Sequence, residues 1–155
     1  MSDHREYSAT PLWRKLGIRE GARVLCTRAP GEFDAELERL APLPPGVERL
    51  RRLGPKSQPE SRPKSGRDLD VVIAFFTRRA DLAAHFTALA AAIASDGRLW
   101  IAWPKKSASL DTDLDFDTVQ AAGLDAGLVD NKSASITDAF QGLQFVVRVR
   151  DRPLR

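Results

Sequence analysis

Basic side chains follow four apolar segments of this sequence, and they are the residues best suited to binding an anion. We call them the basic rim. The basic rim consists of Arg28, Arg51, Arg52, Arg78, Arg79, Lys105 and Lys106. Guanidinium and ammonium groups gathered in one place bind phosphate, carboxylate or a nucleic-acid backbone. The alternative is that these residues are basic only because the ends of strands are solvated.

The segment IAWPKKSASLDTDL, residues 101–114, combines a lysine pair with an aromatic residue. Trp103 precedes the lysines, and it either stacks on a base or packs in the core. A helix predicted to begin near Thr112 would add main-chain N–H groups that favour an anion. The predicted anion-binding site comprises Arg28, Arg78, Trp103, Lys105, Lys106, Ser107 and Thr112.

Two other residues have side chains that can react, but neither predicts a catalytic centre. His85 stands four residues after Asp81, a spacing that allows the carboxylate to orient the imidazole on a helix. The sequence ties no nucleophile to this pair, so a surface histidine is the alternative reading. Cys26 lies in the middle of an apolar run, where a thiol behaves as a small buried hydrophobe. We predict no catalytic residue.

Carboxylates alternate along DTDLDFD, residues 111–117, and such clusters can bind a hard cation. The calcium-loop pattern fails here, because Phe116 occupies the glycine position and no distal glutamate follows. Capping of a helix by Thr112 or Asp113 accounts for these residues instead. One cysteine and two histidines also exclude the common structural zinc sites, so we predict no metal.

Length and composition indicate one globular domain. The 155 residues carry a net charge of +3, which is too small to favour a nucleic-acid partner. The N-terminus has no signal-peptide pattern, and no apolar stretch approaches the roughly 20 residues that span a bilayer. A single cysteine fits a reducing compartment. We therefore expect a cytoplasmic protein without a membrane partner.

Hydrophobic periodicity predicts alternating helices and strands. Residues 1–9 are predicted to be a flexible tail, and residues 54–67, with three prolines and two glycines, a disordered loop. Apolar runs predict strands over residues 22–29, 47–53, 68–77, 98–104, 128–137 and 142–150. Helices are predicted over residues 10–17, 30–41 and 79–97, and within 111–123. In the 79–97 helix, Leu82, Phe86, Leu89 and Ile93 share one face.

This order of elements predicts an α/β fold. Alternating strands and helices favour a mostly parallel sheet with helices on both faces, because a right-handed crossover places a helix between parallel neighbours. The last two strands follow each other after a short connection and form an antiparallel pair. We predict a single truncated Rossmann-like domain, a three-layer sandwich, spanning residues 1–155.

Two resemblances follow from these segments. The order of elements resembles the class I methyltransferase variant of the Rossmann fold. YSATPLWRKLGI, ARVLCTRAPGEF, DGRLWIAWPKKSAS with TDL, GLVDNK and GLQFVVR are similar to an uncharacterised bacterial family, domain of unknown function 3052. That resemblance covers nearly the whole chain and implies no activity. Ala139 and Phe140 depart from the tryptophan-containing pair that the family leads us to expect.

The sequence argues against binding of a methyl-donor cofactor. A methyltransferase needs a glycine-rich turn after its first strand, and an acidic residue after its second strand to hold the ribose. Here the first turn reads CTRAPGEF, with Pro30 and one glycine, and the second strand ends in RLRRLG. About one helix and one strand are also missing near residues 54–67. Glu32 or Asp34 could fill the position of the acidic residue.

These observations favour a non-catalytic module that binds an anion or a nucleotide, or that regulates another protein, and that needs no cofactor. One alternative is a degenerate S-adenosylmethionine-dependent methyltransferase that uses the same basic rim. The other is a module for protein–protein interaction.

Overall fold

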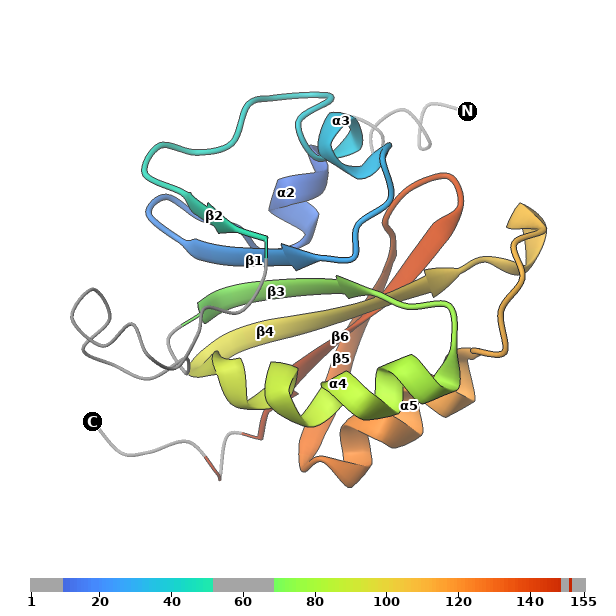
Figure 1. The fold of residues 1–155 in the computed structure, drawn as a ribbon. Helices are drawn as coiled ribbons and strands as arrows, with labels where there is room; N and C mark the ends of the chain where they lie inside the picture. Colours follow the sequence, from blue (N-terminus) through green and yellow to red (C-terminus); the bar gives the residue numbers. More distant parts are fainter. Residues whose placement is uncertain (1–9, 52–68, 149–150, 152–155) are drawn as a thin grey trace.

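The computed structural model describes residues 10–51, 69–148 and 151. The predicted tail at residues 1–9 and the whole of the predicted 54–67 loop lie outside the described residues. A six-stranded sheet with the order β2-β1-β3-β4-β6-β5 forms the centre of the fold (Figure 1). Its strands are β1 (Arg23–Thr27), β2 (Glu48–Leu50), β3 (Leu69–Phe75), β4 (Ile93–Pro104), β5 (Leu128–Ser135) and β6 (Phe140–Val147).

The sheet is mostly parallel, as predicted. Parallel pairing joins β1 to β2, β1 to β3 and β3 to β4. Antiparallel pairing joins β4 to β6 and β5 to β6, so the C-terminal pair is confirmed. Among the described residues β2 stands at one edge of the sheet. The place of the helix and strand that we expected to be missing falls outside the described residues.

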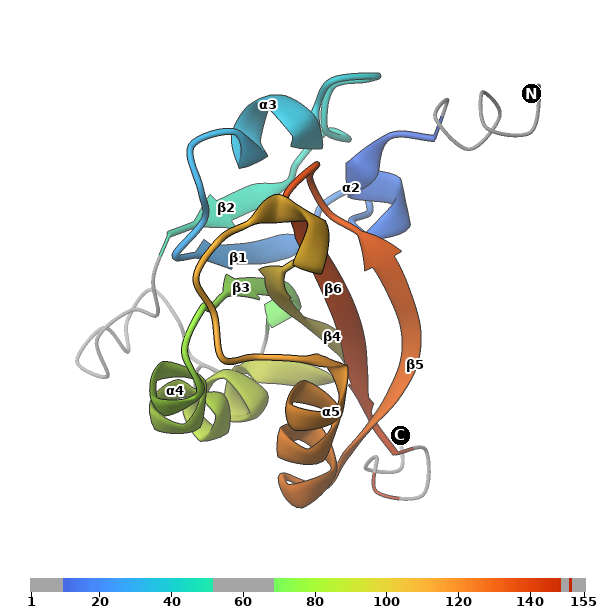
Figure 2. The same cartoon turned by 90° about the vertical axis from the view of Figure 1, so that its right-hand side faces the viewer.

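Helices cover both faces of the sheet (Figure 2). The short helices α2 (Leu12–Lys15) and α3 (Phe33–Leu37) lie on one face. The longer helices α4 (Arg79–Ala92) and α5 (Phe116–Asp125) lie on the other. Each face has its own hydrophobic cluster, because alternate residues of the central strands point to opposite sides. The predicted three-layer arrangement is therefore confirmed.

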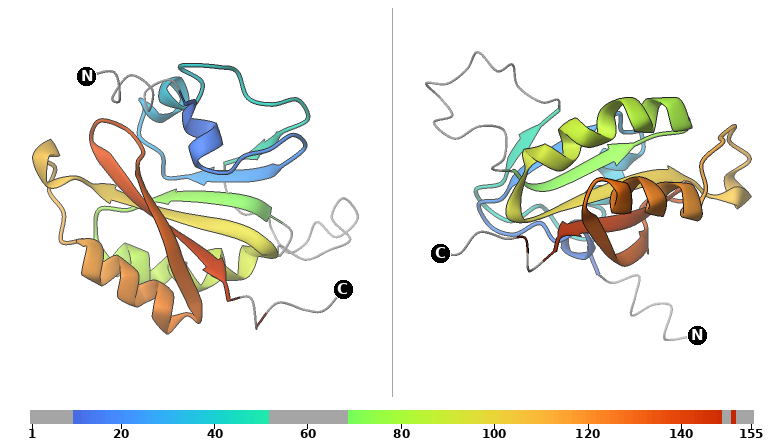
Figure 3. Two further views of the ribbon diagram at one scale, coloured as in Figure 1. Left: turned by 180° about the vertical axis from the view of Figure 1, so that it is seen from behind. Right: turned by 90° about the horizontal axis from the view of Figure 1, so that it is seen from below.

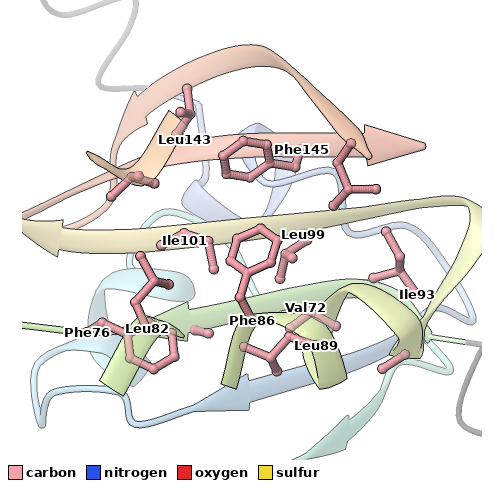
Figure 4. Packing of buried hydrophobic residues seen from close by; sticks show 14 of the residues in the cluster. Val72, Phe76, Leu82, Phe86, Leu89, Ile93, Leu99, Ile101, Leu143 and Phe145 are labelled. Atoms are coloured by element: carbon pink, nitrogen blue, oxygen red, sulfur yellow. The ribbon is translucent and has the colours of Figure 1, made fainter. Parts of the chain in front are cut away.

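The periodicity of α4 fits its packing except at the C-terminal end. Leu82, Phe86 and Leu89 are buried against β3, β4 and β6, as Figure 4 shows. The helix ends at Ala92, and Ile93 has an extended backbone that pairs with Leu69. The prediction that the helix continues to residue 97 was wrong. The spacing of apolar residues along α4 gives no sign that Ile93 will pair with Leu69 of β3 instead of continuing the helix.

Helix α3 is also shorter than the predicted range of 30–41. Phe33 and Leu37 are fully buried, but Leu40 is 41% exposed. The apolar stripe that would hold a longer helix against the sheet therefore ends at Leu37. Helix stability in proteins comes mainly from such packing, so the chain leaves the helical conformation at Glu38.

Candidate anion site at the carboxyl edge of the sheet

The loops after β1, β3 and β4 lie together at the carboxyl edge of the parallel strands, on the right in Figure 1. Ligands of open α/β sheets bind outside this edge, where the strand order reverses. The reversal lies between β1 and β3, since β2 and β3 flank β1 on opposite sides. The turn between β5 and β6 reaches the same edge (Figure 3), because the Lys105 N–H donates to the Ala139 carbonyl at 2.8 Å.

Arg28 lies across this reversal point. Its backbone has a φ of 62°, a left-handed conformation that favours glycine. The side chain donates from Nε to the Phe75 carbonyl at 3.1 Å and from Nη2 to Asp81 at 3.2 Å. Its guanidinium carbon lies 5.0 Å from the centre of the Phe76 ring. The first turn therefore carries a large cation where a cofactor-binding loop would carry a small residue.

A hollow of about 230 Å³ opens beside Arg28. We call it the Arg28 hollow. Its lining residues are Arg28, Pro30, Phe75, Phe76, Thr77 and Phe140. They come from the ends of β1 and β3 and the start of β6, so the hollow lies at the reversal point.

Asp111 and Asp113 contact the two arginines at the start of α4. Arg78 forms an ion pair with Asp111. The Asp113 carboxylate accepts a hydrogen bond from the main-chain N–H of Arg79 at 2.7 Å. The Asp113 main-chain carbonyl accepts a second one from Nε of the Arg79 side chain at 2.8 Å. The Asp113 carboxylate adds negative charge at the N-terminus of α4, where Asp81 also lies in the first turn. The Arg78 guanidinium is therefore paired with a carboxylate, whereas the Arg79 guanidinium is held by a main-chain carbonyl.

The basic residues after β2 also have a carboxylate near them. Asp34 accepts a hydrogen bond from Arg49 at 2.9 Å and lies 3.8 Å from the exposed Arg51. Arg52 lies outside the described residues.

The two lysines after β4 differ from these arginines. Lys105 donates from Nζ to the hydroxyl oxygen of Ser135 at 2.7 Å. Lys106 and Ser107 are exposed in a single turn of 3₁₀-helix, Lys106–Ala108. Within the part of the chain that the structure describes, neither lysine forms an ion pair. Lys106 is exposed to solvent, and Lys105 is half-buried.

The remaining predicted site residues are engaged in the fold. Trp103 is 2% exposed, and its ring meets Phe116 edge-on with 6.4 Å between centroids. Thr112 donates its hydroxyl to the Thr77 carbonyl at 2.7 Å and so ties the loop before α5 to the end of β3. Asp115, rather than Thr112 or Asp113, caps α5.

The N-terminus of α5 is occupied by acidic side chains. The Asp115 carboxylate accepts the Thr118 N–H at 2.8 Å, and this hydrogen bond lowers the pKa of Asp115. Asp117 lies in the first turn of the same helix. An anion approaching these amides would meet two carboxylates, so the helix terminus does not extend the lysine site.

His85 and Cys26 have structural surroundings. His85 Nδ1 lies 2.8 Å from the Asp81 carbonyl, which can only accept, so Nδ1 carries the proton. The Asp81 carboxylate binds Arg28 instead of the imidazole. Burial raises the pKa of the Cys26 thiol, although the neighbouring Arg49 lowers it. The thiol is therefore protonated at neutral pH. No group of three or more metal-ligating side chains occurs among the described residues.

Sequence reasoning missed the partners of the basic rim. Arg28 and Asp81 are 53 residues apart, and Arg78 and Asp111 are 33 apart. The aspartates were visible in the sequence, but their pairing depends on how the loops meet at the edge of the sheet. Ser135 was hidden for the same reason, because it reaches Lys105 from the far end of β5.

Comparison with solved structures identifies the fold. A protein from Bordetella parapertussis, described as a possible exported protein, matches with a TM-score of 0.58 and 12% identity over 94% of this chain and 68% of its own. A chain of the Haloferax volcanii complex that contains the Trm112 methyltransferase activator matches with a TM-score of 0.55 and 14% identity. That match covers 93% of this chain and 88% of the other.

Magnesium protoporphyrin IX methyltransferase from Synechocystis PCC 6803, solved with bound S-adenosylmethionine, gives a TM-score of 0.51 and 13% identity. It is matched over 94% of this chain and 78% of its own. No family model and no curated protein matches the sequence, so membership of domain of unknown function 3052 stays a prediction. No helix among residues 10–51 and 69–148 is long and apolar enough to cross a membrane. At these identities the likeness concerns the fold, which is that of the class I S-adenosylmethionine-dependent methyltransferases.

Proposed function

We propose that this protein is a non-catalytic cytoplasmic module that binds a phosphate-bearing or carboxylate-bearing ligand through Lys105, Lys106 and Ser107. The observation that carries the proposal is the difference among the strand-end cations. Arg28 and Arg78 have carboxylate partners, whereas the two lysines form no ion pair within the described residues. Arg79 has no ion pair among the described residues either, but its guanidinium is held by the Asp113 carbonyl, so the two lysines are the charges best placed for a ligand.

The local geometry supports an anion at this place. An ammonium group has three donors, and Lys105 uses one of them on Ser135. The hydrogen bond holds its side chain beside the strand end, so less side-chain entropy is lost on binding. Lys106 and the Ser107 hydroxyl follow in the same exposed turn. Because the lysines are near the surface, we expect weak binding that falls as salt concentration rises.

Three features support the absence of methyl transfer. Arg28 lies across the reversal point, where the fold would hold its cofactor. The end of β2 presents Leu50 and Arg51 instead of a carboxylate for a ribose. The Arg28 hollow, at about 230 Å³, is smaller than the roughly 300–1,000 Å³ of pockets for drug-sized ligands. A degenerate methyltransferase remains the alternative, because the fold is shared.

A thermal-shift experiment tests the proposal with inorganic phosphate, ADP and S-adenosylmethionine as separate probes. A ligand at ten times its dissociation constant stabilises the folded state by about 1.4 kcal/mol. For a domain of this size that shift raises the melting temperature by about 3–6 °C. We expect phosphate or ADP to give this response, and S-adenosylmethionine to give none.

Charge-reversal variants separate the lysine site from general electrostatics. Lys105→Glu with Lys106→Glu should abolish the response to phosphate and ADP. Arg14→Glu with Arg19→Glu is the matched control, because it makes the same change in net charge at two exposed positions. Equal loss in both variants would refute a specific lysine site. A response to S-adenosylmethionine alone would favour the methyltransferase, and a stable dimer without any ligand response would favour protein interaction.

A further inference from the structure

We infer that the crevice beside the Arg28 hollow holds a binding site for a small organic cation, and that the Arg28 side chain occupies this site from within the chain. An external cation would bind by displacing Arg28, which therefore acts as an internal competitor. The site uses none of the residues of the lysine site, and its ligand has the opposite charge. The inference goes beyond the proposed anion site and does not depend on it.

The three groups that hold the Arg28 guanidinium all attract positive charge. Nε donates to the Phe75 main-chain carbonyl at 3.1 Å, and Nη2 donates to the Asp81 carboxylate at 3.2 Å. The guanidinium carbon lies 5.0 Å from the centre of the Phe76 ring, and the face of such a ring carries negative partial charge. We call these three groups the cation site. They belong to the end of β3 and the first turn of α4, so they are separate from the loop that carries Arg28.

Pairing between β3 and β4 holds the two phenylalanines of the cation site without help from Arg28. Phe75 pairs with Ala102 in the sheet, and the Phe76 N–H donates to the Ala102 carbonyl at 2.9 Å. With Arg28 in place Phe76 is only 1% exposed, so a cation from solution reaches the ring face only when the Arg28 side chain moves away. Because these groups are already in position, little conformational entropy is lost when a cation replaces the guanidinium.

Arg28 is held weakly enough to be displaced. The side chains of Arg28 and Asp81 are 39% and 46% exposed, and ion pairs this accessible to water are weak. Arg28 also has a φ of 62°, a conformation that costs energy for residues other than glycine. The Arg28 hollow, with about 230 Å³, borders the side chain and gives it room to move aside. The geometry therefore allows exchange between Arg28 and a cation from solution.

The hydrogen bonds of Arg28 indicate which cations fit the site. Two nitrogens of one planar group reach two acceptors, the Phe75 carbonyl and the Asp81 carboxylate, and a guanidinium presents its N–H groups in this fixed arrangement. An ammonium group has the charge but lacks the plane. A urea has a similar shape but no charge, so it loses the attraction of the carboxylate and the ring face. We expect methylguanidinium to bind most tightly, methylammonium less tightly and N-methylurea least tightly.

Ligand-observed NMR titrations with these three probes test the site in the full chain. Arg28→Gly removes the internal competitor, and glycine suits the φ of 62° at this position. We expect methylguanidinium to bind this variant about tenfold more tightly than it binds the original protein. Arg28→Met is the matched control, because it removes the same charge but keeps much of the side-chain length over the Phe76 ring. Its gain in methylguanidinium binding should be about twofold at most.

Further measurements decide between a built site and general attraction of cations. Circular dichroism checks that Arg28→Gly is folded, and Arg28→Ala replaces it if it is not. Adding Asp81→Asn to either variant should weaken methylguanidinium binding several-fold, because one of the three groups loses its charge. Equal gains in Arg28→Gly and Arg28→Met would overturn the inference, as would equal binding of methylguanidinium and N-methylurea or no gain in a folded variant. None of these outcomes bears on the lysine site, whose probes are phosphate and ADP.

Discussion

Gly123→Ala tests the contact between α5 and β6 on which the fold rests. A Cβ atom at Gly123 would lie 2.0, 2.4 and 2.6 Å from three carbon atoms of the Phe145 ring. Real Cβ contacts do not come this close, so either the ring or the helix must move. Phe145 has no exposed surface, and its ring meets the Phe86 ring edge-on with 5.7 Å between centroids. Neighbouring side chains therefore prevent the Phe145 ring from moving aside. The helix itself must shift away from the sheet.

Two opposing effects set the size of the change. Replacing glycine by alanine inside a helix favours folding by about 1 kcal/mol. Overpacking a filled core costs about 1–3 kcal/mol, and a contact at 2.0 Å belongs at the upper end. We therefore expect the free energy of unfolding to fall by about 1–2 kcal/mol. The melting temperature should drop by about 2–8 °C.

Urea and thermal denaturation followed by circular dichroism measure this change. Gly31→Ala is the matched control, because no atom lies within 4 Å of its added Cβ and its φ is not in the left-handed region. That variant should be as stable as the original protein or slightly more stable. If Gly123→Ala were as stable as Gly31→Ala, the helix would not pack against Phe145 as described.

Three further predictions concern single residues. Because the pKa of Asp115 is lowered by its hydrogen bond from Thr118, its stabilising contribution is complete above its ordinary value of 3.8 and is lost as pH falls through the lowered value. Asp115→Asn should therefore be less stable than the original protein at pH 7, and thermal melts should show the difference shrinking below about pH 4. Trp103→Phe should lower the free energy of unfolding by about 1–3 kcal/mol in urea titrations, because it leaves a space beside Phe116. It should not change the response to phosphate. Cys26 should resist a colour-forming thiol reagent in the native protein and react fully in denaturant, because burial keeps it protonated and covered.

The sequence predicts the central sheet well and the ends of the helices less well. The apolar runs around Val24 and Val71 become adjacent parallel strands, because strands that are buried on both faces are typically continuous apolar runs. The end of α4 could not be predicted, since Ile93 satisfies the helical spacing and also pairs with Leu69. The choice between these two roles depends on a neighbouring strand that lies far away in the sequence.

Prediction of the candidate site depends even more on contacts between residues that are far apart in the sequence. The types of residue at the strand ends are visible in the sequence, and the rule for parallel strands places Arg28, Arg78 and Lys105 at one edge. Whether these residues can bind an anion depends on which charges remain unpaired. That depends on Asp81 and Asp111, which reach the arginines through the tertiary structure.

The fold itself creates a crevice at the reversal of strand order, whether or not a ligand uses it. In this protein the crevice is partly filled by a side chain of the chain itself, with Arg28 held by the Phe75 carbonyl and the Phe76 ring. The residues that hold the sheet and helices together, such as Leu99 and Ile101, lie in the buried core and do not line the crevice. Selection on the core can therefore preserve the architecture while the crevice changes its chemistry. Identities of 12–14% to proteins of the same fold are compatible with such a separation, because a fold does not specify a function. Experiments on the function of this protein should therefore change the side chains at the carboxyl edge of the sheet.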